Sequence, residues 1–480
     1  MVRTRVTAAL TWVTPSKRSV SADGRREPHA PPGPSVTELD AQACDILVQT
    51  DDAVRTSEQE LAFAAARLGE RTAAPFAAAV SAAHADLAAA FLIRQLLDED
   101  HHHDDAARRS RLAEITARCA EASRVLDEHA EPFDQLQDLP ARAPELLAEV
   151  DAHVAQQTAR VSASRQVLSR LAAGYTAQAV DTVAANPGEA AERLAFAAAV
   201  VAAARPELAA GQVRAAAVQL QAAEAAADQA ADLLTAVEHT AAGLTQAASA
   251  LPAALREVGA EIADAHTLLA GRPDDEQADL AARAGEVAAT ARAQRAAGPF
   301  DALTALRELQ RAECALGQAL ASHRPQAERQ VRARAVLDQA MLVARTSVRA
   351  ARNLITTRRG GVGARARTRL AEAHRHFQQA VGLVHDDPEA ALAEAEHADA
   401  LAVRGSVLAA LDIARFSAAR PGRYPRCSDV ATAAGGAVLG GILIDCDAGG
   451  RMGLASFGGS ATRGRHRLDA GGSAPAQPLR

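Results

Sequence analysis

Apolar side chains return every three or four residues over most of the chain, a period that indicates one buried face of a helix. Val36, Leu39, Ala43 and Ile46 open the first of these stripes, and Thr37 is the predicted N-terminal cap of the helix that carries them. Because each stripe must be hidden from water, the pattern predicts helices that pack side by side along their length.

Residues 35–140 predict a helical hairpin unit. Pro75 marks a kink or a restart in its first half, and the polar stretch 98–105 breaks the period and predicts a loop. The helix after the loop carries the clearest heptad of the chain, which runs through Leu112, Ile115, Cys119, Ala122, Leu126, His129, Phe133 and Leu136. Two stripes joined by a short polar loop predict an antiparallel pair.

Residues 141–416 predict an array of long helices in coiled-coil contact. Asn186-Pro187-Gly188-Glu189 has the order of a helix start, with a cap, a proline in the first turn and an early acid. Similar starts recur at Gly298–Asp301 and at Asp387–Glu389, at unequal spacings that exclude a strict short repeat. Pro252 is expected to open a further helix, and residues 326–358 predict one about 50 Å long, at about 1.5 Å per residue.

The end of this array predicts a last hairpin. Its facing apolar positions are Leu370, Phe377, Val381 and Val384 on one helix, and Leu392, Leu401, Leu408 and Leu411 on the other. Residues 1–34 and 417–480 lack the helical period and are expected to be a disordered leader and a disordered tail rich in Gly, Arg and Ser. The predicted fold class is all-α, built from extended antiparallel helical hairpins and coiled coils with disordered termini.

Composition agrees with long helices rather than a thick globular core. Hydrophobic residues make up 49% of the chain, but much of that share is alanine, and aromatic residues make up only 2%. Alanine has the highest helix propensity but buries little area. The net charge is −7 with acids and bases interspersed, so no nucleic acid is expected as a partner.

The five cysteines are widely spread and show no metal-type spacing, which suits a reducing compartment. The longest uninterrupted apolar runs are far shorter than the ~18 residues of a membrane-spanning helix. Taken alone, these features predict a soluble chain.

Four places in the sequence contain residues that could bind a ligand or another helix. His101–His103 could bind a metal, but a solvated loop is the favoured interpretation, and His374 and His376 point to different sides of a helix and are interpreted as surface residues. Thr357–Arg365 combines glycines and arginines that could cradle phosphate, yet a tight connection between helices, with glycines at positive φ, is favoured. Gly435–Ile444 could allow close helix approach in lipid, but a disordered tail or weak self-association is the favoured interpretation.

No nucleophile-and-base arrangement is found either. We therefore predict no catalytic, cofactor-binding or metal-binding residue, no cofactor and no small-molecule substrate.

Several stretches are familiar when taken together and in order. They are Pro32–Asp40, Thr50–Leu61, Thr357–Gly363, Ala366–Ala373, Gly436–Gly441 and Ser456–Gly459. In this order they resemble the long helical region of actinobacterial TPM-domain-containing proteins, over roughly residues 32–465. Asp445–Asp447 departs from the family pattern, because the family tail continues there with glycines.

The resemblance implies a cytoplasmic helical region. In that family it follows a signal peptide, an extracytoplasmic TPM domain, often described as a phosphatase domain, and one membrane span. Residues 1–31 are too few for those elements, so the chain is expected to represent the helical part alone. We expect a non-enzymatic scaffold or interaction protein that binds a protein partner, or itself, through helical seams. Its expected location is the cytoplasm, with the inner face of the membrane as a variant.

Two alternatives stay open beside the scaffold. One is a membrane-associated component of the cell envelope that reaches the membrane indirectly. The other is the remnant of a TPM-domain phosphatase.

Overall fold

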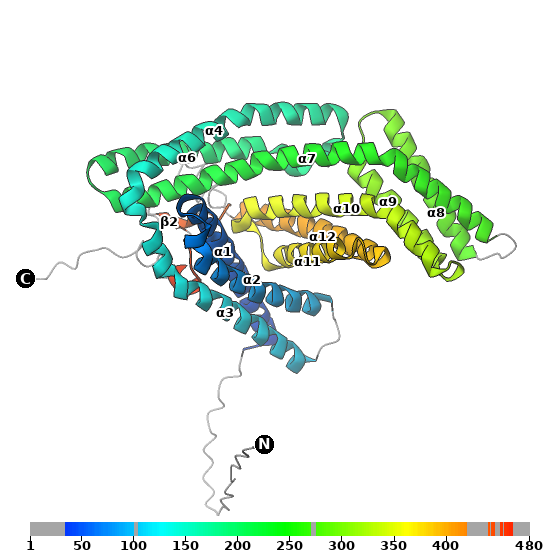
Figure 1. The fold of residues 1–480 in the computed structure, drawn as a ribbon, viewed down its shortest axis with the longest axis horizontal. Coiled ribbons are helices and arrows are strands. Elements are labelled where there is room, and N and C mark those ends of the chain that lie inside the picture. Colours follow the sequence, from blue (N-terminus) through cyan, green and yellow to red (C-terminus); the bar gives the residue numbers. More distant parts are fainter. Residues whose placement is uncertain are drawn as a thin grey trace, which may run out of the picture.

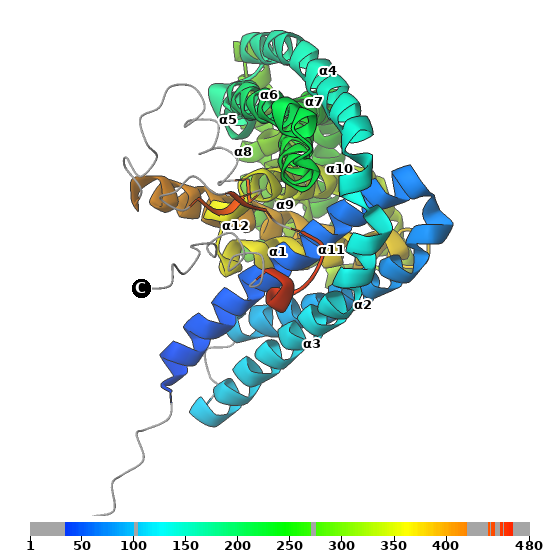
Figure 2. The same cartoon turned by 90° about the vertical axis from the view of Figure 1, so that its left-hand side faces the viewer.

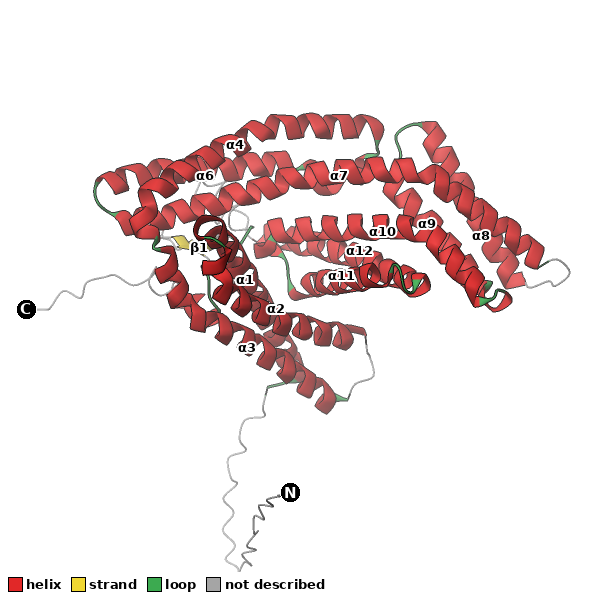
Figure 3. Ribbon diagram, in the orientation of Figure 1, coloured by secondary structure: helices red, strands yellow, loops and turns green. Residues whose placement is uncertain are grey.

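The chain folds into long helices that stack in layers (Figure 1). The structure is a computed structural model and describes residues 34–99, 104–269, 275–419, 440–441, 443–446, 452–454 and 456–463. Helices dominate these residues, and the strands described among them form one short pair (Figure 3). The predicted all-α fold class is confirmed.

The first layer is a three-helix bundle of α1 (Val36–Leu68), α2 (Glu70–Glu99) and α3 (Asp105–Gln137). The predicted hairpin corresponds to α2 and α3, and α1 packs against both. The bundle lies below the long helices and is tilted against them (Figure 2). His101–His103 lie outside the described residues.

Local hydrogen bonds and backbone angles set the ends of α1 and α2 differently from the prediction. Ser35 caps α1 in place of Thr37: its Oγ accepts from the Glu38 N–H, while the Glu38 carboxylate accepts from the Ser35 N–H at 2.7 Å. The chain restarts at Gly69, whose φ of 88° favours glycine. Pro75 lies inside α2, where burial of the neighbouring Phe76 keeps the helix in place.

The heptad of α3 forms the seam of this bundle. Six of its eight residues are buried, and His129 and Leu136 are half-buried. They pack with apolar residues of the other two helices, among them Leu47, Leu87 and Phe91.

The second layer contains α4 (Leu139–Gly174), α5 (Ala177–Ala184), α6 (Asn186–Ala209) and α7 (Val213–Leu268). Pro252 does not open a helix, because α7 runs through it without interruption for 56 residues. The flanking Leu251 and Leu255 are buried against α8 and α9, and this packing holds the helix across the missing hydrogen bond.

The start of α6 also departs from the prediction. Asn186 is buried at 2% exposure and does not cap the helix. Its Nδ2 donates instead to the carbonyl oxygen of Leu233 on α7 at 3.1 Å, so it ties two helices together.

The third group contains α8 (Asp275–Ala297), α9 (Ala302–Ala319), η1 (Ala321–His323), α10 (Gln326–Thr357), η2 (Arg359–Gly361), α11 (Ala364–Leu383) and α12 (Pro388–Ala419). The two other predicted starts are confirmed. Asp301 Oδ1 accepts from the Thr304 N–H at 3.0 Å, and Asp387 Oδ1 accepts from the Ala390 N–H at 3.1 Å.

The last hairpin corresponds to α11 and α12, which pack along each other. Leu401 lies in its core, and the half-buried Leu370, Phe377 and Leu392 pack against that core, as predicted. Val381 and Leu411 do not, with exposed fractions of 47% and 48%. Because α12 has 32 residues and α11 only 20, Leu411 extends past its partner helix, while Val381 lies at the turn where α12 has only begun.

The tail is not disordered where the structure describes it. Leu443–Cys446 (β1) and Met452–Leu454 (β2) form an antiparallel pair, and Phe457 is buried at 1% exposure. The prediction of disorder for 417–480 is therefore wrong at these residues, because backbone hydrogen bonds pair β1 with β2 and Phe457 is buried against Phe76 and Phe133. Residues 1–33 and 420–439 lie outside the described part.

Candidate functional site

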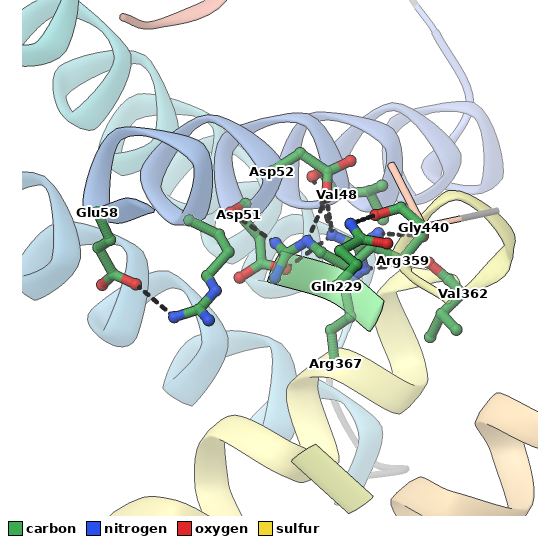
Figure 4. A network of polar contacts seen from close by, with 10 residues as sticks. Val48, Asp51, Asp52, Glu58, Gln229, Arg359, Val362, Arg367 and Gly440 are labelled. Atoms are coloured by element: carbon green, nitrogen blue, oxygen red, sulfur yellow. Dashed lines mark hydrogen bonds and ion pairs between the residues drawn. The ribbon is translucent and has the colours of Figure 1, made fainter. Parts of the chain in front are cut away.

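The connection between α10 and α11 lies against α1, and two arginines there bind two aspartates of α1 (Figure 4). Arg359 Nε donates to Asp52 Oδ1 at 2.9 Å, and its Nη2 donates to Asp51 Oδ2 at 2.7 Å. Arg367 Nη1 donates to the same two carboxylates, at 2.7 Å for Asp51 and 2.6 Å for Asp52. We call these four residues the arginine–aspartate junction.

Arg367 is the buried member of the junction, and Arg359 and the two aspartates are half-buried. Arg367 is 3% exposed, and its other nitrogens donate to the carbonyl oxygens of Val362 and Arg359 at 3.0 and 2.6 Å. Burial opposes the charge on Asp52, but Arg367 and Arg359 outweigh it and lower the pKa of that carboxyl. The pairs therefore fix the position of α1 on α11.

The same connection also holds the second layer. Arg358 Nη2 donates to Glu189 at 2.7 Å and to Asn186 at 3.2 Å, both on α6. Arg193 of α6 is fully buried and donates to the carbonyl oxygen of Thr357 at 2.8 Å. Residues 357–359 thus contact the first and second layers at once.

These contacts decide between the two interpretations of Thr357–Arg365. The segment is a connection between helices, as favoured, and Arg358 and Arg359 are already paired with internal carboxylates. The prediction that its glycines have a positive φ was wrong, because Gly360, Gly361 and Gly363 all have a negative φ. At Gly363 the N–H donates to Asp412 Oδ2 at 3.0 Å, and a Cβ would lie only 3.2 Å from that oxygen.

The described tail returns to the same region. Gln229 of α7 donates to the carbonyl oxygen of Gly440 at 2.6 Å, and the Gly458 N–H donates to Ser57 Oγ of α1 at 3.1 Å. Five of the stretches that carry the family resemblance therefore meet around the junction, although they lie hundreds of residues apart. Of Gly435–Ile444, residues 435–439 and 442 lie outside the described part.

Beside the junction lies a groove of about 630 Å³ between α1, α2, α10 and α11. Its apolar lining is formed by Val54, Leu87, Ala88, Phe91, Val348, Ile355, Leu370 and Ala371. A volume of this size lies in the range of ordinary ligand sites.

The charges along the groove do not balance. Its acids are paired: Asp51 within the junction, Glu58 with Arg55 at 3.3 Å, and Glu372 with Arg375 at 2.7 Å. By contrast, no carboxylate in the described part of the chain forms an ion pair with Arg352, which is exposed.

Two histidines also line the groove. His84 and His374 line the groove near Arg352, and the pKa of His374 is lowered by burial first and then by the charges of Arg352 and His84. The charge at the groove without an ion pair in the described part of the chain is therefore the positive charge of Arg352, which Asp232 of α7 attracts only from beyond ion-pair distance.

His374 and His376 have the separate surroundings that their spacing predicted. His376 Nδ1 lies 2.5 Å from Glu394 of α12, and its ring lies 5.4 Å from that of His397. The described residues contain no group of three or more side chains placed to hold a metal ion.

Sequence reasoning missed Asp51, Asp52, Arg352, Asp127 and Phe457. The adjacent aspartates beside the buried face of α1 were the one usable signal, because two neighbouring acids at such a place require cations. Asp127 and Phe457 have no local signal for their contacts, since their partners lie far away in the sequence, and Arg352 has none because only the fold forms the groove that it lines.

Fold and site thus define a helical protein with a buried ionic junction and an open groove. No family model matches the chain. It is 35% identical over 435 residues to UPF0603 protein MT2410 of Mycobacterium tuberculosis (strain CDC 1551 / Oshkosh), and equally to UPF0603 protein Rv2345 of strain ATCC 25618 / H37Rv. Each match covers 88% of this chain and 65% of the relative, so the chain spans slightly less than two thirds of the length of these relatives. No solved structure matches.

Proposed function

We propose that the chain is a non-enzymatic helical scaffold that binds a partner protein in the groove between α1, α2, α10 and α11. The observation that supports the proposal is the unpaired positive charge of Arg352, beside His84 and His374, over an apolar floor. The resemblance to the helical region of actinobacterial TPM-domain-containing proteins supports a place in the cytoplasm, or at the inner face of the membrane.

The partner segment that fits best is an amphipathic helix with an acidic face. Its apolar side chains would lie on Leu87, Phe91 and Ile355, and its carboxylates would meet Arg352. Recognition of a helix in an apolar groove is a common way of binding a peptide, and the charge selects the partner and speeds the encounter.

Calorimetry with a pair of model peptides tests this function. One peptide has a leucine face and a glutamate face, and the other replaces each glutamate by lysine. We expect the acidic peptide to bind, the lysine peptide not to bind, and added salt to weaken the complex. Arg352→Glu should lower the affinity about tenfold or more, because it puts like charges in contact.

Arg349→Glu is the matched control. Arg349 is exposed on the same helix and does not line the groove, so the same charge change should leave binding unaltered. Equal binding of both peptides, or equal effects of the two substitutions, would contradict the proposal.

A membrane-associated component of the cell envelope is the second candidate. One observation favours it: α2 is long and apolar enough, by length and composition, to cross a membrane. The buried side chains of α2 nevertheless pack against α1 and α3, as in the core of a bundle. Fractionation of cells decides, because a protein found only in the soluble pool excludes this candidate.

A remnant of a TPM-domain phosphatase has no supporting observation among the described residues beyond the family resemblance. Turnover of a generic phosphomonoester by the purified chain, above background, would revive it.

A further inference from the structure

Ser456–Arg463 lies on the first layer as a bound peptide would, in contact with α1 and α3 (Figure 2). The Gly458 N–H donates to Ser57 of α1, a residue 401 positions earlier in the chain. Between Ala419, the last residue of α12, and Gly440 there are 20 residues, enough to span several tens of ångströms. The segment is thus connected to the helices by a long stretch of chain.

Asp127 of α3 receives the backbone of this segment. One oxygen, Oδ1, accepts from the N–H of Gly459 at 3.0 Å, the N–H of Thr462 at 2.9 Å and the Thr462 hydroxyl at 2.6 Å. The other oxygen accepts from the N–H of Ala461 at 3.2 Å. Four donors on one carboxylate form a dense and directional contact.

An aromatic pocket receives Phe457. Its ring stacks on Phe133 with centroids 4.2 Å apart and meets Phe76 edge to face at 6.1 Å. In a chain with nine phenylalanines, three of them gather at this point. Burial of this ring provides the apolar part of the contact.

The two glycines make the contact selective. Gly458 has a φ of 134°, which favours glycine. At Gly459 a Cβ would collide with the backbone of Ser123 on α3. Phe457, Gly458, Gly459 and Thr462 are therefore each required by a different feature of the surface, whereas Ser460 is exposed.

We propose that the α1–α3 bundle is a recognition site for this Phe-Gly-Gly-x-x-Thr segment, filled by the chain's own tail and able to take the same segment from a second copy. The interaction does not depend on the groove proposed above. In the unaltered chain the attached tail has the advantage of a high effective concentration, so exchange between copies is suppressed. Exchange between copies is expected when binding of the attached tail is weakened, as in domain swapping.

The first experiment uses full-length Phe457→Ala protein and a fluorescent peptide of residues 454–465. We expect the peptide to bind this variant, and to bind the unaltered chain about tenfold more weakly or worse, because the attached tail competes. A Gly459→Ala peptide should lose about tenfold or more in affinity, and a Ser460→Ala peptide should bind like the original.

The second experiment mixes two full-length variants. Asp127→Asn with Ser57→Ala has an intact tail but a weakened site, and Phe457→Ala has an intact site but a weakened tail. We expect each variant alone to be a monomer and the mixture to form a one-to-one dimer in sedimentation. Thr462→Val replaces Phe457→Ala if circular dichroism shows that variant to be unfolded.

The proposal is overturned if the folded tail variant binds neither the peptide nor the partner variant. It is also overturned if the Gly459→Ala peptide binds as well as the original.

Discussion

Glu60 of α1 is buried against α3 and accepts a hydrogen bond from Gln137 Nε2 at 3.2 Å. Burial raises the pKa of this carboxyl to about 7, and the hydrogen bond from Gln137 only partly offsets the cost of the charge. Nearby, burial likewise raises the pKa of Asp228 on α7 to about 7. At the scale of single residues, the region around the junction thus holds acids that titrate near neutral pH.

We predict that Glu60 makes the fold less stable as pH rises. Between about pH 4.5, the ordinary pKa of Glu, and about pH 7 the folded state keeps a proton that the unfolded state has released, so the free energy of unfolding falls over this window. Glu60→Gln should remove that loss and stabilise the protein at pH 8 by about 2–3 kcal/mol, with little effect at pH 4. Urea unfolding at both pH values measures this.

The exposed Glu131 on α3 provides the control. Glu131→Gln should change little at either pH, because a solvated carboxylate has no burial cost. An equal gain from both substitutions, or the same gain for Glu60→Gln at pH 4 and pH 8, would contradict the assignment.

At the scale of helices, the seam of α3 shows what the sequence can predict. Leu126 is fully buried, between Ser123 and Ala130 of the same face. The period of the seam follows from the burial of one side of the helix, and this pattern can be seen in the sequence of the helix alone. The sequence does not predict the position of the prolines in the same way. Pro75 and Pro252 lie inside helices because neighbouring helices hold the flanking residues, and the local sequence does not show which helices those are.

Leu126→Asp is expected to destabilise the first layer strongly. It places an unpaired carboxylate in the seam and removes a fully buried side chain, and we expect a loss of several kcal/mol. Thermal unfolding followed by circular dichroism measures the loss. Ala113→Asp, at an exposed position of the same helix, should leave the melting temperature nearly unchanged. Similar melting of the two variants would show that the seam is not buried.

At the scale of the whole molecule, the arginine–aspartate junction joins segments that are 316 residues apart. No local pattern predicts such a pairing. The sequence therefore predicts that Thr357–Arg365 connects two helices, but it does not predict which residues this connection contacts. The same holds for the groove, because its four helices are brought together only by the fold. Several stretches quoted for the family resemblance contribute residues to this region, but their sequence does not give its geometry.

We predict that Arg367→Leu destabilises the protein by about 2–4 kcal/mol, since it removes a buried arginine and leaves two half-buried aspartates with one arginine. Adding Asp52→Leu should restore part of the loss, and the double-mutant cycle measures the coupling. Arg124→Leu, at an exposed ion pair, is the control and should leave the unfolding midpoint in place. Independent, additive effects of Arg367→Leu and Asp52→Leu would contradict the junction.

The position of Phe457 has a consequence for how the protein is made. The ribosome releases the chain from its N-terminal end, and domains generally fold as they emerge. Phe76 and Phe133 leave the ribosome more than three hundred residues before the ring that covers them. Until Phe457 emerges, the nascent bundle therefore presents the aromatic surface that this ring later covers.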